Sequence, residues 1–166
     1  EVRGGDQVSV TDLLAAVSGM DIEVIATLND DQLHGLPAVP DNVRTVDYVS
    51  LNELLPSCSA IIHQGGWGTL QTALVHGVPQ IVVPTRIWDN PLKAERIEQS
   101  GAGLHVADPE RLTAADLSGM LRRVLAEPSF AGNAARLRTE MNQAPTPADT
   151  VPVLEKLTAE HRIHQW

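Results

Sequence analysis

A short apolar run that ends in a cluster of glycines constrains the fold of this chain more than any other feature. Residues 60–62 have the length and composition of a buried parallel strand, and the run stops at His63 and two adjacent glycines. Beyond Gly68 the apolar residues recur three and four apart, as on one face of a helix, until Gly77 supplies a C-terminal stop. This segment therefore predicts a strand, a glycine turn and a helix.

The glycine turn also has the features of a phosphate-binding site. Gly65, Gly66 and Gly68 leave the backbone open to close approach, while the first turn of the helix presents unpaired N–H groups and the positive end of its dipole. The side chains of His63 and Thr69 offer further donors to the same oxygens. A plain tight turn is the alternative, although it needs only one glycine. The spacing excludes a P-loop and a dinucleotide-binding fingerprint.

Further apolar segments with strand and helix patterns follow the same alternation. Strands are predicted at residues 22–28, 43–48, 80–84 and 103–106, and helices at residues 8–17, 51–55, 94–98, 114–126, 128–141 and 149–160. Loops and prolines separate them. Strands that alternate with helices are typical of an α/β domain with parallel strands.

The motif in the glycine turn, together with residues farther along the chain, resembles a known family. The matching residues are His63-Gln64-Gly65-Gly66-Trp67-Gly68-Thr69, residues 73–80, Pro84 and Asp89-Asn90. They resemble the C-terminal, donor-binding half of GT-B sugar-nucleotide glycosyltransferases, and in particular the bacterial enzymes that attach deoxysugars to macrolides, anthracyclines and other polyketide antibiotics. The resemblance, from about residue 4 to residue 162, implies a Rossmann-like, mostly parallel sheet with helices on both faces.

This resemblance assigns a part of the sugar nucleotide to each of three loops. The implied contacts are His63, Gly65, Gly66, Gly68 and Thr69 for the diphosphate, Tyr48 and the Val49 backbone for the nucleobase, and Asp89 and Asn90 for the sugar hydroxyls. Arg86 and Trp88 lie beside the sugar pair in sequence. Leu51 stands where many relatives have glutamine, and its side chain offers no hydrogen bond to a ribose hydroxyl.

Some of these residues also fit a structural role. Tyr48 suits the edge of the core as well as it suits a nucleobase. Asp89 and Asn90 suit the N-terminal cap of a helix that Pro91 opens, although the sugar role is favoured.

Two groups of residues resemble metal ligands only superficially. The acidic turn at residues 29–31 follows a strand, and a helix cap explains it better than a metal site does. His161 and His164 are three apart, yet they lie at the terminus without a carboxylate cluster. We expect no metal and no other cofactor.

The composition argues against several classes of partner. The net charge of −9 and the five aromatic residues provide neither the basic surface nor the stacking rings of a nucleic-acid binder. No apolar run approaches the roughly 18 residues of a membrane span. Cys58 is the only cysteine, so it forms no internal disulfide, and its apolar neighbours predict a buried position. We therefore expect a cytoplasmic protein.

The resemblance also implies a function for the whole chain. Residues 1–166 would form one donor-binding domain, without its first strand and without the N-terminal acceptor domain. The implied reaction transfers a deoxysugar from a nucleoside diphosphate, expected to be thymidine diphosphate, to a hydroxyl of a hydrophobic acceptor such as a polyketide. The family's catalytic base is a histidine of the N-terminal domain, so we expect no catalytic residue here and no activity of this chain alone. Some members also require an auxiliary activator protein.

Two other functions fit the same residues. One alternative is the donor-binding subunit of a two-subunit glycosyltransferase, which works only with a separate partner, although such a subunit would normally contain its first strand. A non-catalytic nucleotide-binding module is the other alternative. The retained His63, Thr69 and Asp89 argue against it.

Overall fold

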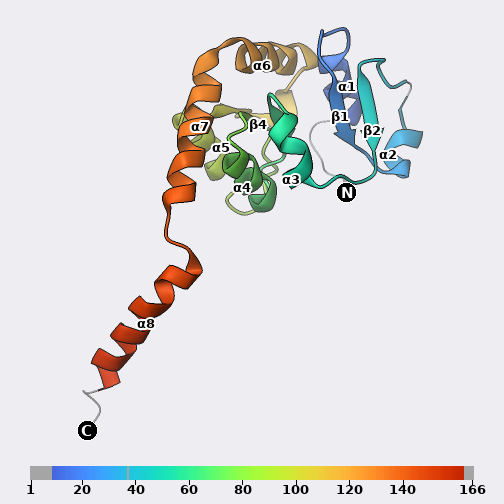
Figure 1. Cartoon of the computed structure of the whole chain (residues 1–166). Coiled ribbons are helices and arrows are strands. Elements are labelled where there is room, and N and C mark those ends of the chain that lie inside the picture. The colour runs from blue at the N-terminus through green and yellow to red at the C-terminus, as the bar shows by residue number, and fades with distance from the viewer. Residues whose placement is uncertain (1–8, 37, 163–166) are drawn as a thin grey trace.

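The computed structural model describes residues 9–36 and 38–162 and shows alternating strands and helices (Figure 1). The strands are β1 (Val24–Thr27), β2 (Val43–Val46), β3 (Ile61–His63), β4 (Gln80–Val82) and β5 (Gly103–His105). The helices are α1 (Val10–Val17), α2 (Asp30–His34), α3 (Leu51–Leu54), α4 (Trp67–His76), α5 (Asn90–Gln99), α6 (Ala114–Ala126), α7 (Pro128–Gln143) and α8 (Pro147–Arg162), with single 3-10 turns at Leu55–Ser57 and Pro109–Arg111. The predicted α/β class is confirmed.

The strands divide between two parallel sheets. β1 pairs with β2, while β4 lies between β3 and β5 in the second sheet. In the register of the second sheet, Ile62 lies opposite Ile81, which in turn lies opposite Leu104. Every strand pairing in the described residues is parallel, as the sequence predicts, but no pairing there joins β1 to β3.

Helices cover both faces of the three-stranded sheet. Ile81 and Leu104 pack on one face against buried residues of α1 and α6, in the same cluster as Phe130 of α7. Val82, the next residue along β4, points the other way and packs against α4 and α5. Because side chains alternate along a strand, β4 is enclosed on both faces. All three of its residues are buried.

Side-chain caps fix the starts of several helices. The Ser9 hydroxyl accepts a hydrogen bond from the Asp12 amide at 3.1 Å. Thr113 forms a capping box with Asp116. Asn29 forms a second capping box with Gln32, with hydrogen bonds of 2.9 and 3.0 Å. The interpretation of the acidic turn at residues 29–31 as a helix cap is therefore confirmed.

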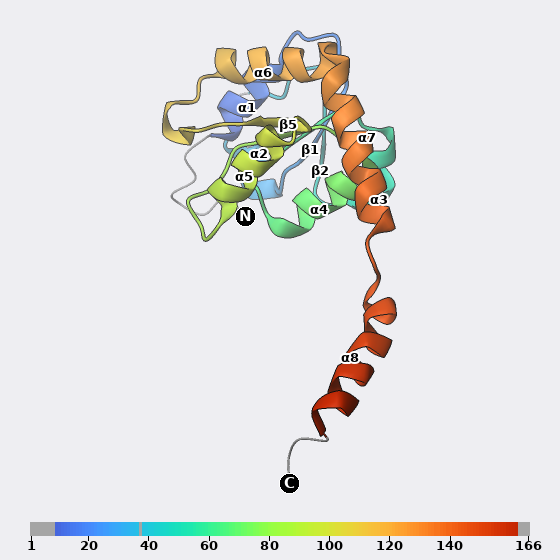
Figure 2. The ribbon, with the colours of Figure 1, turned by 90° about the vertical axis from the view of Figure 1, so that its left-hand side faces the viewer.

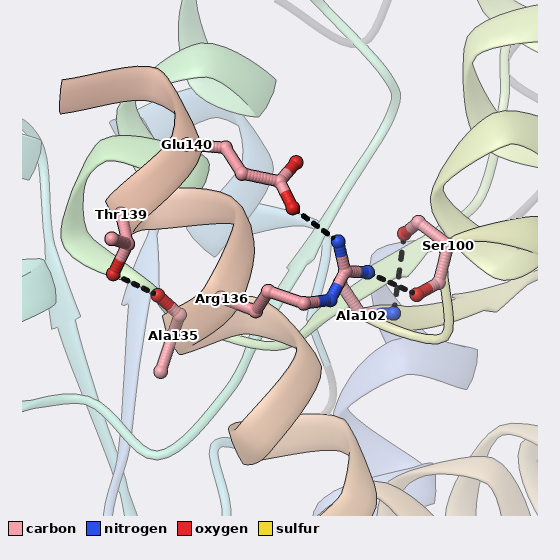
Figure 3. A network of polar contacts seen from close by, with 6 residues as sticks. All are labelled: Ser100, Ala102, Ala135, Arg136, Thr139 and Glu140. Carbon is pink, nitrogen blue, oxygen red and sulfur yellow. Dashed lines mark hydrogen bonds and ion pairs between the residues drawn. The ribbon is translucent and has the colours of Figure 1, made fainter. Parts of the chain in front are cut away.

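Polar contacts attach α7 to the turn between α5 and β5 (Figure 3). The Arg136 guanidinium forms an ion pair with Glu140 at 2.6 Å and donates to the Ser100 carbonyl at 3.4 Å. Asn133 donates to the Gly101 carbonyl at 3.2 Å. Gly101 has φ of +73°, and a side chain there would collide with Asn133. The glycine in this turn therefore permits the close approach of α7.

Helix α8 extends away from the other elements in both views (Figures 1 and 2). Its described side chains are exposed, including Val151, Val153, Leu154 and Leu157. The His161 ring contacts the Leu157 carbonyl at 2.9 Å, while His164 lies outside the described residues. Neither α8 nor any other described helix combines the length and the apolar character that crossing a membrane requires.

Cys58 lies at the edge of a small cluster formed by the 3-10 turn and α4. It is half-buried and packs against a core that contains Leu55, Ala73 and Val78. Burial raises the pKa of its thiol. The sequence therefore predicts its apolar surroundings correctly and overstates its burial.

Candidate functional site

The loops that follow β3 and β4 meet at the carboxyl edge of the three-stranded sheet. The His63 carbonyl accepts from the Val83 amide at 2.9 Å, and the Gln64 carbonyl accepts from the Thr85 amide at 3.3 Å. Farther along the second loop, the side-chain Nδ2 of Asn90 donates to the Thr85 hydroxyl at 2.9 Å. The structure therefore brings together the glycine turn and the loop that ends at Asn90, which lie apart in sequence. Open α/β sheets bind ligands at this edge.

The glycines of the turn serve two different purposes. Gly65 has φ of +86°, and a Cβ there would lie 3.2 Å from Val82 Cγ1 and 3.5 Å from Asn90 Cβ. Its left-handed conformation favours glycine, and a Cβ there would also press against Val82. At Gly66 and Gly68, in contrast, a Cβ would meet no described heavy atom within 4 Å. These two residues expose bare backbone to open space.

The N-terminus of α4 lies beside this open space. Its N-cap residue is Gly66, which has no side chain with which to cap the helix. The amides of Trp67, Gly68 and Thr69 form the first turn, where the geometry of a helix supplies no intrahelical acceptor. Thr69 is half-buried there. Free amides and a helix dipole favour an anion at this point.

His63 lies at the end of β3, with both ring nitrogens in hydrogen bonds. Nδ1 accepts from the Gly65 amide at 3.0 Å, and Nε2 contacts Oε1 of Gln80 at 2.8 Å. Burial lowers the pKa of His63, and the hydrogen bond to Gln80 opposes that effect. The ring is therefore held in its neutral form. The expected donation from His63 to a phosphate stays a prediction, although in this structure both nitrogens already have partners within the chain.

The interpretation of Asp89 and Asn90 as a helix cap is confirmed in position only. Asp89 occupies the N-cap position of α5, but its side chain accepts no capping hydrogen bond. Its carboxylate instead forms an ion pair with Lys93 at 3.1 Å, and the Asn90 side chain turns back to Thr85. The Asp89 backbone at φ −98° and ψ 14° lies outside the extended region that a cap residue normally adopts. The sugar role of this pair stays a prediction.

Lys93 is a residue of this site that the sequence analysis missed. Its ammonium lies between the Asp89 carboxylate and the Trp67 ring, 5.5 Å from the ring centroid. Only 13% of its side chain is exposed. A half-enclosed cation therefore connects α5 to the first residue of α4. The spacing of four between Asp89 and Lys93 was the available indication, because such pairs share a helix face.

Tyr48 and Val49 follow β2 in the other sheet. Tyr48 is 82% exposed, so the interpretation as an aromatic at the edge of the core is wrong. Val49 is half-buried. Trp88, beside the sugar pair, is 95% exposed and has φ of +53°. Arg86 forms an ion pair with Glu110 at 3.5 Å. The aromatic rings of Tyr48 and Trp88 are thus available to a ligand.

An uncapped, glycine-lined helix N-terminus at the carboxyl edge of a parallel α/β domain is the arrangement with which such domains bind phosphate groups. The chain belongs to the family described as the C-terminal domain of erythromycin biosynthesis protein CIII-like proteins, whose model matches residues 11–157.

Named relatives and solved structures agree with this family. The chain is 57% identical to aclacinomycin-T 2-deoxy-L-fucose transferase of Streptomyces galilaeus over 162 residues, which are 98% of this chain and 37% of that protein. It is 48% identical to tylactone mycaminosyltransferase of Streptomyces fradiae, covering 98% of this chain and 35% of that protein. The crystal structure of glycosyltransferase VinC in complex with dTDP matches with a TM-score of 0.84 and 40% identity, over 92% of this chain and 38% of VinC. The fold is that of the C-terminal domain of GT-B glycosyltransferases, and the chain spans well under half the length of these relatives.

Proposed function

We propose that residues 1–166 form the donor-binding domain of a longer glycosyltransferase. In this proposal the enzyme transfers a deoxysugar from a thymidine diphosphate sugar to a hydroxyl of a polyketide or similar hydrophobic acceptor. Support comes from the family match and from the names of the relatives, which are deoxysugar transferases. It also comes from VinC, a structural neighbour solved with dTDP.

The observation that carries the proposal is the bare N-terminus of α4. Gly66 leaves the helix uncapped, and the space around Gly66 and Gly68 is open. A diphosphate placed there accepts hydrogen bonds from the first-turn amides and from the Thr69 hydroxyl. Such donors stabilise the negative charge that develops on a leaving nucleoside diphosphate. Gly65 and His63 complete the turn that presents these donors.

The other parts of the donor fall on the two remaining loops. The nucleobase stacks on the exposed Tyr48 ring and bonds the Val49 backbone. Asp89 and Asn90 bind sugar hydroxyls, and Lys93 holds the Asp89 carboxylate in place. In this assignment the chain supplies donor recognition only. The catalytic base and most of the acceptor pocket belong to an N-terminal domain, so this chain alone is inactive.

The enzyme works in the cytoplasm, with an auxiliary activator protein as a candidate partner, and it engages neither a nucleic-acid polymer nor a membrane. No metal holds the diphosphate, because the donors assigned to it are backbone amides and the Thr69 hydroxyl, and the nearby Asp89 carboxylate is already paired with Lys93. The donor set thus differs from the carboxylate oxygens that Mg²⁺ prefers.

Calorimetry tests both the ligand and the absence of a metal requirement. We expect thymidine diphosphate to bind this chain with equal affinity in the presence and absence of a chelator, and more tightly than uridine diphosphate. Gly66→Ala places a methyl group in the open space and should weaken binding, whereas Gly119→Ala, on the exposed face of α6, is the matched control. Binding that disappears with chelator would overturn the metal-free site. Undetectable binding of both nucleotides would overturn the function.

A further inference from the structure

The position of the proton on His63 follows from one backbone hydrogen bond. The Gly65 amide points at Nδ1 from 3.0 Å, and a backbone N–H can only donate. Nδ1 must therefore carry a lone pair. A neutral imidazole then has its proton on Nε2, and this proton is donated to Oε1 of Gln80 at 2.8 Å. The two bonds together select a single tautomer.

The second partner of His63 is Gln80, a buried polar residue. It is fully buried, and it is the one polar residue in the buried core of the described chain. Burying an amide is unfavourable unless its hydrogen bonds are made. The side-chain oxygen of Gln80 accepts from His63, and the side-chain Nε2 of Gln80 donates to the Leu70 carbonyl of α4 at 3.5 Å. The side chain thus connects the end of β3 to the helix whose N-terminus forms the anion site.

The geometry of the strands explains why residue 80 reaches His63. His63 lies opposite Val82 in the sheet, so Gln80 is its diagonal neighbour on the same face. On the other side of the ring lies Gly65, in the left-handed conformation with φ of +86°. A hydrogen bond from the amide of Gly65 to the side chain two residues earlier stabilises the turn between them, as an Asx turn does for asparagine. The ring thus connects the core to the phosphate turn.

We propose that Gln80 is a positioning residue for the diphosphate site, and that His63 acts there as the acceptor that fixes Gly65, and not as a donor to the phosphate. This inference rests on the proposed function, because it assigns the glycine turn to a diphosphate. Gln80 holds the Nε2–H tautomer, the Nδ1 lone pair holds the Gly65 amide, and the turn then presents the amides of α4. Protonation of Nδ1 would set two N–H groups against each other and release the turn.

The tautomer is directly measurable in the ligand-free protein. Long-range ¹H–¹⁵N correlation of the histidine rings at pH 7.5 should show a protonated Nε2 and an unprotonated Nδ1 for His63, assigned by comparison with His63→Asn. In Gln80→Leu this pattern should weaken or change. Gln80→Met, which keeps the unbranched shape, covers the case in which the leucine variant fails to fold. A His63 ring that carries its proton on Nδ1 in the wild-type protein would overturn the inference.

Titration with thymidine diphosphate links the tautomer to the site. We expect Gln80→Leu and His63→Ala to weaken binding about three- to ten-fold, while His63→Asn restores most of the loss, because its side-chain oxygen accepts the Gly65 amide. Adding Gln80→Leu to His63→Asn should weaken binding no further. Equal affinity of wild type and Gln80→Leu would overturn this inference alone. A wild-type chain that binds no nucleotide would overturn the proposed function as well.

Discussion

The two sheets differ in how firmly they hold the residues assigned to the ligand. β4, at the centre of the three-stranded sheet, is buried along its whole length, and the glycine turn beside it is fixed by hydrogen bonds from Gln80 through His63 to Gly65. In the two-stranded sheet only one of the four residues of β2 is buried, and Tyr48 just beyond it is largely exposed. The proposed diphosphate site is thus held by the core, while the proposed nucleobase site depends on one surface ring.

The largest effect that we predict is a loss of stability on substitution of Gly103, in strand β5 of the three-stranded sheet. A Cβ there would overlap the Gln80 carbonyl and approach Cγ2 of Ile97 to 2.9 Å. Gly103→Ala should lower the free energy of unfolding by about 3 kcal/mol, the upper end for overpacking, because backbone must move. Urea denaturation measures this.

Gly119→Ala is the matched control for that substitution. Its methyl group would enter open space on a helix, so it should raise stability by about 0.5–1 kcal/mol. If both alanine variants are equally stable, the close packing at Gly103 does not constrain the sheet.

Removal of the Tyr48 ring should weaken nucleotide binding and leave the stability of the domain almost unchanged. Because the side chain is 82% exposed, Tyr48→Ala should change stability by less than about 0.5 kcal/mol. Loss of a stacked base costs about 1–3 kcal/mol, so thymidine diphosphate should bind about five-fold to a hundred-fold more weakly. Calorimetry with inorganic pyrophosphate, which has no base, is the control and should show no change. A loss shared by both ligands would remove Tyr48 from the nucleobase site.

The sequence predicted helices and strands well where the spacing of apolar residues agrees with the turn or cap residues at their ends. The glycine turn is the clearest example, because residues 60–62 end at His63 and the helix period begins after Gly68. The capping box at Asn29 also follows from local residues. Such features depend on neighbours within a few positions, and these are visible in a sequence.

Contacts between distant segments were not visible in the sequence. The hydrogen bond from His63 to Gln80 joins residues 17 apart, and it depends on the register of β3 with β4. The exposure of Tyr48 was not visible in the sequence either, which fits a nucleobase contact and a packed edge of the core equally well. At Asp89, where the sequence favoured a sugar contact over a helix cap, the carboxylate forms an ion pair with Lys93, four residues later.

A smaller effect on ligand affinity is predicted for Asp89, in the loop between β4 and α5. Asp89 is held by Lys93, and its side chain remains 61% exposed, so Asp89→Ala should remove hydrogen bonds to the sugar with little change in stability. Affinity for an intact thymidine diphosphate sugar should fall about two- to ten-fold, as for the loss of one net hydrogen bond, while affinity for thymidine diphosphate stays constant. Asp31→Ala, an exposed acid of α2, is the control. Equal losses for both ligands would remove Asp89 from the sugar site.

The smallest predicted effect is a dependence of stability on pH that originates at His63. Burial lowers the pKa of its ring below the usual 6.5, so the unfolded chain takes up the proton at a higher pH than the folded chain does. Stability from this residue is therefore complete above pH 6.5 and declines as the pH falls from there to the lower folded-state pKa, below which it declines no further. The neutral Gln80 and the Gly65 amide are the ring's hydrogen-bonding partners.

Urea denaturation between pH 8 and pH 5 measures that decline. His63→Asn removes the titrating ring and keeps an acceptor for the Gly65 amide, while the exposed acids that titrate in the wild type are unchanged. Subtracting the two profiles isolates His63, and the wild type should lose more stability than the variant as the pH falls. Parallel profiles would mean that the ring takes up its proton equally well in the folded and unfolded chain. The core would then not enforce the neutral tautomer, and the contrast between a fixed diphosphate turn and a surface nucleobase site would lose its main support.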